Sequence, residues 1–238
     1  MVEYIHSEDT HNIKAAEIIL PLVFKFSHAN SIIDIGCGIG TWLSIASSLG
    51  ISDIKGVDGN YVDKELLEKH MNLEFFIAAD LSLPLALDRG FDLAICLEVA
   101  EHLPESSAKT LINSLVKHSD VILFSAAIPG QGGQNHLNEQ WPDYWAQLFE
   151  VHDYVFLDII RPLIWDNPKV DYWYRQNIFL VVKKNHELVF KYSVNHLPLV
   201  HPELLERVRQ NKDNEINFLK KQLAIHPIKR WIMSIIKK

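Results

Sequence analysis

The regular alternation of short apolar runs with helix-like stretches most constrains the fold of this 238-residue chain. Apolar, β-branched runs predict strands at residues 31–35, 54–57, 73–78, 91–97, 121–127, 155–160 and 177–183. Helical periodicity appears before the first of these strands, at residues 12–26, and between later ones, at residues 41–49, 64–70 and 106–118. Strands separated by helices of this length form βαβ units in a parallel sheet. We therefore predict an α/β fold with a doubly wound, seven-stranded sheet.

The strand pattern ends near residue 184. We predict an α/β domain at residues 1–184 and a helical C-terminal extension at residues 185–238. The extension starts with a helix over residues 203–223, is interrupted by Pro227, and closes with the basic amphipathic tail IKRWIMSIIKK. This tail can lie on an anionic membrane surface, or it can pack on the protein body or on a second subunit. Peripheral membrane contact and a homodimer both remain open.

Composition and charge argue against several classes of function. The net charge is −7, yet the residues from Glu203 onward carry a net +5, so the preceding body is strongly acidic. Such a body is a poor match for a phosphate backbone, and nucleic acid is an unexpected partner. No apolar run reaches the ~20 residues of a membrane span. Two cysteines in apolar stretches and a start without a basic region predict a cytoplasmic protein, with peripheral membrane contact as the variant.

The most informative motif is IIDIGCGIGTW at residues 32–42, between a predicted buried strand and a helix. Glycine permits a tight turn and lets the backbone approach a ligand closely. A dinucleotide fingerprint would place its third glycine at position 41, which is Thr41 here. Acidic residues then follow the next two strands, Asp58 in GVDGN and Asp80 in AADL. Carboxylates at strand ends can bind a ribose or an adenine amine, although each can also be an ordinary turn residue.

Taken together, the segments DIGCGIG, GVDGN, AADL and FDLAICLEVAEHLP resemble the class I S-adenosylmethionine (SAM)-dependent methyltransferases, in particular the type 11 and type 23 methyltransferase domains. The resemblance covers about residues 10–184. It implies a Rossmann-like fold and SAM as the methyl donor. The glycines would wrap SAM, Asp34 would orient the glycine loop, Asp58 would bind the ribose, and Asp80 and Leu81 the adenine end. The cofactor-binding set that it implies is Asp34, Gly36, Cys37, Gly38, Gly40, Asp58, Gly59, Asp80, Leu81 and Leu97.

The segment EVAEH carries Glu98, Glu101 and His102 straight after a predicted strand, and His136 follows the next strand. Two carboxylates and two imidazoles can hold Mg²⁺ or Mn²⁺ beside an acceptor hydroxyl. The pattern is similar to metal-dependent O-methyltransferases of the ubiquinone-pathway type and of the small-RNA 2′-O type. The alternative is that the acids cap a helix and His102 packs, in which case His136 acts as the general base. The catalytic candidates are therefore His136, Glu98 and Glu101.

Two aromatic-polar segments, residues 139–145 and 171–177, are candidates for shaping the acceptor pocket, and Arg161 and Arg175 could bind an acid or a phosphate. We predict methyl transfer to a hydroxyl oxygen of a small molecule, such as a sugar, a phosphorylated compound or another surface-glycan or natural-product precursor. Three rivals remain: a nicotinamide dehydrogenase, an RNA 2′-O-methyltransferase, and a SAM-binding scaffold without catalysis.

Overall fold

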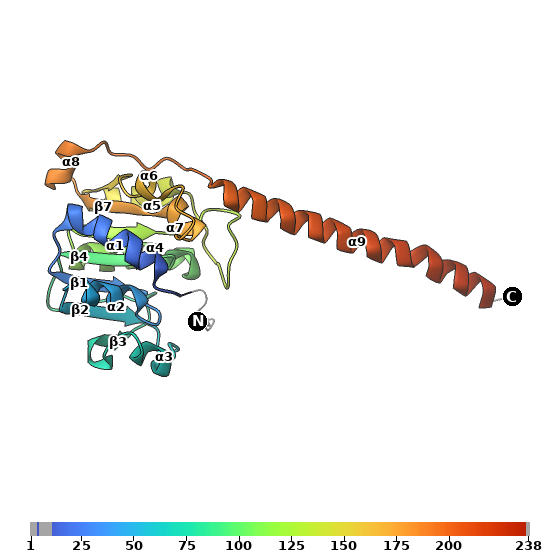
Figure 1. Ribbon diagram of the computed structural model, residues 1–238, viewed down its shortest axis with the longest axis horizontal. Helices are drawn as coiled ribbons and strands as arrows, with labels where there is room; N and C mark the ends of the chain where they lie inside the picture. The colour runs from blue at the N-terminus through green and yellow to red at the C-terminus, as the bar shows by residue number, and fades with distance from the viewer. Residues whose placement is uncertain (1–3, 5–10, 237–238) are drawn as a thin grey trace. The chain divides into compact units, whose positions relative to one another are not determined.

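A seven-stranded sheet with the order β3-β2-β1-β4-β5-β7-β6 forms the centre of the protein (Figure 1). The computed structural model describes residue 4 and residues 11–236, with side chains as far as residue 222. The strands are β1 Ser31–Ile35, β2 Asp53–Asp58, β3 Phe76–Ala78, β4 Leu93–Leu97, β5 Val121–Ser125, β6 Tyr154–Leu157 and β7 Phe179–Lys183. The predicted seven-stranded Rossmann-like fold is confirmed.

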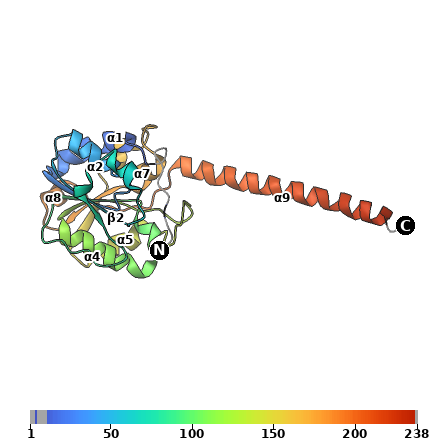
Figure 2. The same cartoon turned by 90° about the horizontal axis from the view of Figure 1, so that it is seen from below.

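Helices cover both faces of this sheet, as the view in Figure 2 shows for α1 and α2 on one side and α4 and α5 on the other. Because neighbouring residues of a buried strand point to opposite faces, each strand contributes side chains to two apolar cores. Ile32 and Ile54 pack in the core under α1 and α2, whereas Ile33 and Val57 pack in the core under α4 and α5. The helices are α1 Lys14–Ser27, α2 Thr41–Ser48, α3 Lys64–Glu68, α4 Ala108–His118, α5 Pro142–Glu150, α6 Arg161–Ile164, α7 Tyr172–Asn177 and α8 Glu187–Lys191.

The strand order reverses between β1 and β4, because β1 pairs with β2 on one side and with β4 on the other, both parallel. In open α/β sheets, ligands bind beyond the carboxyl ends of the strands at such a reversal. The residues that follow β1 and β4 are the glycine loop and the EVAEH segment. The topology therefore brings the two most informative motifs to one crevice.

Two details of the predicted sheet are wrong. The strand β7 runs antiparallel to both β5 and β6, so the sheet is mixed rather than parallel. A fully buried strand is apolar on both faces, and this pattern carries no information on direction. The strand predicted over residues 73–78 is halved, because Leu73–Phe75 forms a 3₁₀ turn that the Asn72 side chain caps through the N–H of Glu74.

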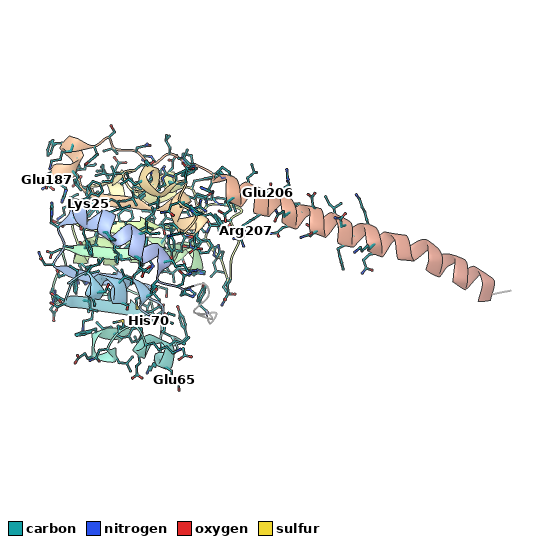
Figure 3. All side chains as sticks on the ribbon, in the orientation of Figure 1. Lys25, Glu65, His70, Glu187, Glu206 and Arg207 are labelled. Carbon is teal, nitrogen blue, oxygen red and sulfur yellow. The ribbon has the colours of Figure 1, made fainter. Side chains whose placement is uncertain are left out.

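The chain divides into two compact units, Met1–Leu199 and Val200–Lys238. The second unit contains the helix α9, Pro202–Ile236, on which Glu206 and Arg207 are labelled in Figure 3. The predicted break at Pro227 is wrong, since this helix continues to Ile236. A proline removes one backbone donor and need not end a helix, and α1 contains Pro21 in the same way.

The amphipathic face predicted for the tail falls on residues 228–236, whose side chains lie outside the described part of the chain. Among the helices in the described residues, none combines the length and the apolar character needed to cross a membrane.

Candidate active site

The loop between β1 and α2 depends on glycine for two separate reasons. Gly36, Gly38 and Gly40 have φ angles of 93°, 52° and 81°, in the left-handed region that other residues avoid. Space is also lacking, because a Cβ atom on Gly36 would lie 2.2 Å from Cγ2 of Val99. One on Gly40 would lie 2.9 Å from Sδ of Met71. The loop backbone is therefore packed closely against its neighbours and has a fixed shape.

Asp58 at the end of β2 braces this loop. Its Oδ2 accepts a hydrogen bond from the N–H of Gly38 at 2.7 Å, and its Oδ1 accepts from the N–H of Gly59 at 2.6 Å and the hydroxyl of Tyr61 at 2.9 Å. Burial raises the pKa of Asp58, and these hydrogen bonds oppose that shift. A carboxylate can accept about four hydrogen bonds, so Oδ2 can still accept one from a ligand hydroxyl.

Asp34 is predicted to orient the glycine loop, and that role stays a prediction. The side-chain hydrogen bond to the N–H of Gly38 comes from Asp58. The Asp34 side chain is only 2% exposed, and its Oδ2 has no hydrogen-bond partner among the described residues. Burial raises its pKa well above the ordinary range, and the charge of Asp58 acts in the same direction. Asp34 is thus a buried carboxyl group beside the loop with capacity for one more donor.

The other members of the predicted cofactor set lie at the neighbouring strand ends. The end of β3 is tied to β2 by the N–H of Ala79, which donates to the carbonyl of Asp58 at 2.8 Å. Next to it, Leu81 is buried, while Asp80 is exposed and accepts from the N–H and hydroxyl of Ser82 at 2.9 and 2.6 Å. Leu97 is the last residue of β4 and is also buried. The predicted set therefore follows four adjacent strands.

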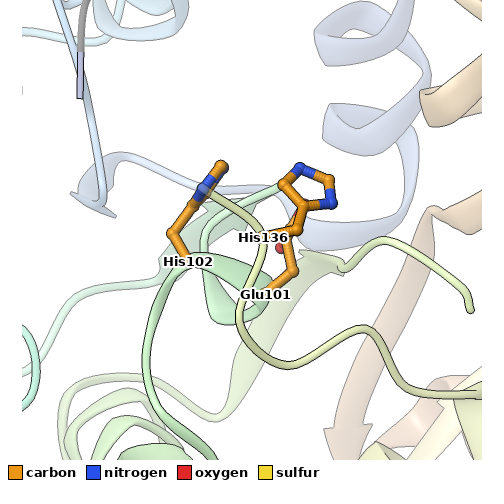
Figure 4. Close-up of side chains that lie close together, drawn as sticks. All are labelled: Glu101, His102 and His136. Carbon is orange, nitrogen blue, oxygen red and sulfur yellow. The ribbon is translucent and has the colours of Figure 1, made fainter. Parts of the chain in front are cut away.

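Beyond β4, a short 3₁₀ turn, Ala100–His102, and the loop after β5 bring three potential metal ligands together (Figure 4). One ligand atom from each of Glu101, His102 and His136 lies within 4.8 Å of the other two. Glu101 is 0% exposed, and neither of its carboxylate oxygens has a hydrogen-bond partner among the described residues. Burial raises the pKa of Glu101 well above its ordinary range and the charge of Glu98 adds to the rise, while the nearby backbone N–H groups of Glu101 and Ala127 oppose it. A buried carboxylate without partners is costly, unless a cation or a donor completes it.

The imidazole of His102 has the protonation state that a ligand requires. Burial lowers its pKa to about 4, and the neighbouring His136 acts in the same direction. The two rings meet edge to face, with centroids 4.8 Å apart. The Nδ1 atom of His102 is buried and has no hydrogen-bond partner among the described residues. Neutral imidazole with an available nitrogen is the form that binds metals.

His136 is oriented by Glu139, three residues further along the loop. The Glu139 carboxylate accepts from the N–H groups of Gly130 and Gly132, each at 2.7 Å, and contacts Nδ1 of His136 at 2.8 Å. Because an ionised carboxylate can only accept, the neutral form of this imidazole carries its proton on Nδ1 and presents a lone pair at Nε2. A Cβ atom on Gly133 would lie 2.1 Å from this Nε2, so the glycine makes room for the ring.

Glu98, the fourth predicted ligand, is held in a different environment. Its backbone is left-handed, with φ of 52°, and its N–H donates to the carbonyl and the hydroxyl of Ser125. Its carboxylate accepts from Nε2 of Gln131 at 2.8 Å and from Nδ2 of Asn177 at 3.1 Å. Gln176 joins the same network through Oε1 of Gln131. Burial raises the pKa of Glu98, while the amide hydrogen bonds oppose the rise.

Sequence reasoning missed two kinds of residue at this site. Gln131 lies in the loop that was selected for His136, and Asn177 lies in the aromatic segment at residues 171–177. Only the fold shows that both side chains meet Glu98. Tyr4 has no sequence signal beyond being an N-terminal aromatic. Its ring meets the ring of His102 edge to face at 4.8 Å. Its pKa is raised by burial and then by the charges of Glu101 and Glu98.

Of the two arginines considered for binding an acid or a phosphate, Arg161 is used within the fold. It is 1% exposed, pairs with Asp158 at 2.6 Å, and donates to the carbonyls of Gln176 and Leu197. Arg175 is also buried and donates to the carbonyl of Trp165. Among the aromatic candidates, Tyr174 packs edge-on against Trp42, with ring centroids 5.4 Å apart.

Comparison with known proteins identifies relatives of this chain. Residues 9–173 match the model of a family described as a methyltransferase domain, of the type 23 kind. The ubiquinone biosynthesis O-methyltransferase of Paraburkholderia phymatum is 31% identical over 109 residues, which cover 42% of this chain. The matched region spans only 47% of that protein, or about half of its length.

Solved structures share the fold at low sequence identity. The methyltransferase domain of the bacterial protein CtHen1 has a TM-score of 0.54 at 20% identity, covering 72% of this chain and 100% of that domain. A sugar N-methyltransferase from Streptoalloteichus sp. ATCC 53650 has a TM-score of 0.58 at 14% identity, covering 75% of this chain and 90% of its own. Magnesium protoporphyrin IX methyltransferase from Synechocystis PCC 6803, with bound S-adenosylhomocysteine (SAH), has a TM-score of 0.53 at 18% identity, covering 71% and 81%.

Proposed function

Since this chain belongs to the family of methyltransferase domains and is a SAM-dependent methyltransferase, we propose that it methylates a hydroxyl oxygen of a small molecule with the help of Mg²⁺ or Mn²⁺. The observation that carries this proposal is the buried, unpartnered carboxylate of Glu101 beside two imidazoles. The O-methyltransferase relative supports an oxygen acceptor.

The donor side of the site follows from the strand ends. We assign SAM to the glycine loop of Gly36, Gly38 and Gly40, where a backbone without side chains permits close approach. Asp58 would accept a ribose hydroxyl at Oδ2, and the unpartnered Oδ2 of Asp34 fits an amino group. Cys37, Gly59, Asp80, Leu81 and Leu97 would complete the surface around the nucleoside.

The metal side rests on the fit of the ligands. Glu101, His102 and His136 form a mixed carboxylate and imidazole set, which suits Mg²⁺ or Mn²⁺ and leaves coordination positions for other oxygens. When bound, the cation would act as a Lewis acid that lowers the pKa of the acceptor hydroxyl. A cation would also satisfy the two Glu101 oxygens, which otherwise have no partner among the described residues. Glu98 would stay in its amide network as a neighbour of this set.

Methyl transfer breaks the bond between the methyl carbon and sulfur, forms the bond between that carbon and the acceptor oxygen, and leaves SAH. The hydroxyl proton has to leave as well. Glu98 is suited to accept it, because burial raises its pKa and makes it a stronger base than an exposed glutamate. If no metal binds, Nε2 of His136 is the general base that we propose, with Glu139 fixing the tautomer.

Calorimetric titration of metal-stripped protein with Mn²⁺ and with Mg²⁺, in the presence of SAH, tests this proposal. We expect saturable binding by the wild type and loss of binding in the double variant Glu101→Gln/His136→Ala. The matched control is Glu105→Gln/His152→Ala, which makes the same chemical changes outside the cluster and should bind like the wild type. Absence of binding by the wild type refutes the metal site, leaves His136 as the base, and opens nitrogen acceptors. Equal binding by both double variants refutes the ligand assignment.

A further inference from the structure

A hollow of about 470 Å³ lies at the beginning of α5, and none of its lining residues belongs to the sets assigned to the donor and the metal. Its walls are Gln140, Trp141, Asp143, Tyr144, Gln147 and Pro198. Five of these six residues come from the first part of α5 and the residues just before it, and Pro198 closes the opposite wall.

The lining residues have the chemistry that a sugar ring requires. The Trp141 side chain, 41% exposed, and the half-buried Tyr144 offer aromatic faces that can pack against the C–H face of a pyranose. Gln140, Gln147 and Asp143 surround them with amide and carboxylate groups that hydrogen-bond to hydroxyls. None of the six lining residues is Lys or Arg. A phosphate or another anion would lack a cationic partner in this wall, so the lining favours an uncharged ligand.

Hydrogen bonds join this hollow to the metal-ligand cluster. Nε2 of Gln140 donates to Oδ1 of Asn138 at 2.9 Å, and the N–H of Asn138 donates to the carbonyl of Glu101 at 3.0 Å. The N–H of Gln140 also donates to the carbonyl of Ala127, just beyond β5, at 3.2 Å. The hollow is therefore two hydrogen-bonded steps from Glu101.

Asn138 provides a second and independent sign of a ligand. Its side chain is 4% exposed, and its Nδ2 makes no hydrogen bond of good geometry among the described residues, although the amide is near enough to the Tyr144 hydroxyl to oppose the rise in the pKa of Tyr144. A buried amide donor without an acceptor is unfavourable by about 1–3 kcal/mol, so such groups usually meet a ligand or water. A polar acceptor placed between the cluster and the hollow would satisfy it.

The hollow is preformed rather than built on a mobile surface. The helix α5 is anchored by Trp145 and Phe149, both nearly inaccessible, which pack against Phe124 at centroid distances of 5.7 and 5.3 Å. On the opposite wall, Nε2 of His196 meets Oδ1 of Asp143 at 3.2 Å, two residues before Pro198. A rigid site loses little conformational entropy when it binds a ligand.

We propose that this hollow is a binding subsite for an uncharged sugar ring of the methyl acceptor, with Trp141 as the stacking platform. The inference rests on the proposed function in one respect, namely that the acceptor hydroxyl enters beside Glu101. Sugar binding itself needs neither the metal nor methyl transfer, and it can be measured without them.

Saturation-transfer NMR and tryptophan fluorescence on the full-length, metal-stripped protein test the subsite. The probes are maltose, cellobiose, lactose and N,N′-diacetylchitobiose, with glucose 6-phosphate as the anionic counterpart. We expect saturable binding of at least one neutral disaccharide, and at least tenfold weaker binding in Trp141→Ala and threefold weaker binding in Gln147→Ala. The control Phe190→Ala removes an exposed aromatic ring on α8 and should bind like the wild type. Retained stabilisation by SAH shows that each variant is folded.

Three results would overturn the subsite: no binding of any neutral disaccharide, binding that is unchanged in Trp141→Ala, or tighter binding of glucose 6-phosphate than of the neutral probes. These outcomes are separate from those of the Mn²⁺ titration. Sugar binding without metal binding would refute the metal site alone, whereas metal binding without sugar binding would refute the subsite alone.

Discussion

The substitution Gly133→Ala gives the sharpest test of how the His136 side chain is positioned. A Cβ atom at residue 133 would lie 2.1 Å from Nε2 of His136, while an ordinary contact begins near 3.4 Å. The ring would therefore have to move by about 1.3 Å, whereas metal–ligand distances tolerate only about ±0.2 Å. Gly133 has no left-handed backbone, so alanine should be accepted there without backbone strain. We expect Mn²⁺ affinity to fall by about 10- to 100-fold, the range for disturbed support of a ligand.

Calorimetry with Mn²⁺ and thermal unfolding, measured on the same samples, check this expectation. The control Gly50→Ala has the opposite profile, because Gly50 has φ of 98° and no atom within 4 Å of the position that a Cβ would take. Alanine at Gly50 should lower the free energy of unfolding by roughly 1–2 kcal/mol and leave Mn²⁺ binding unchanged. Wild-type Mn²⁺ affinity in Gly133→Ala would refute the role of the ring position, as would a fall of equal size in Gly50→Ala.

The buried acids Glu101 and Asp58 and the aromatic ring of Tyr4 give three further tests. Burial raises the pKa of Glu101, so above the ordinary pKa of glutamate the unfolded chain loses a proton that the folded protein keeps. The free energy of unfolding therefore falls as the pH rises from that ordinary pKa towards the raised pKa of the folded state. The thermal stability of metal-stripped Glu101→Gln relative to the wild type should therefore increase from pH 5 to pH 8. A stability difference that stays constant over this pH range would contradict the prediction. Asp58→Asn should weaken SAH binding at least about tenfold in calorimetry, as expected for loss of a charged acceptor, and an unchanged Kd would exclude Asp58 from the donor site. Tyr4→Ala should weaken Mn²⁺ binding while Tyr4→Phe retains it, because the ring packs against His102; equal affinities would exclude that support.

Much of the fold follows from the sequence because its strongest signals are local. Residues 31–35 contain three isoleucines, are followed by glycines at positions 36, 38 and 40, and form β1 as predicted. The close packing of Gly36 against Val99 is not local, yet the glycine itself signals that some neighbour lies close. By contrast, the direction of β7 depends on the path of the chain through α6 and α7, and a buried apolar strand gives no sign of that path.

The part of the candidate site that the sequence predicts consists of residues that directly follow neighbouring parallel strands. Glu101 and His102 follow β4 and His136 follows β5, and these two strands are parallel neighbours. Their carboxyl ends must therefore lie side by side, so three potential ligands meet without any detailed knowledge of the loops. The subsite beside Trp141 was less predictable, since Pro198, which forms its far wall, lies 57 residues away in the sequence.

Glu98 shows why residue spacing alone could not separate the acids. On an α-helix, residues three and four apart share a face, and this would group Glu98 with Glu101 and His102. The chain is not helical at Glu98, where φ is 52°, and the turn that follows is a 3₁₀ turn beginning at Ala100. The left-handed backbone costs roughly 1–2 kcal/mol, and the two hydrogen bonds from the Glu98 N–H to Ser125 offset part of it. This backbone conformation directs one glutamate to the amides of Gln131 and Asn177 and leaves the other buried without a partner among the described residues. In the function that we propose, the two carboxylates therefore have separate roles, Glu98 as a hydrogen-bonded base and Glu101 as a metal ligand.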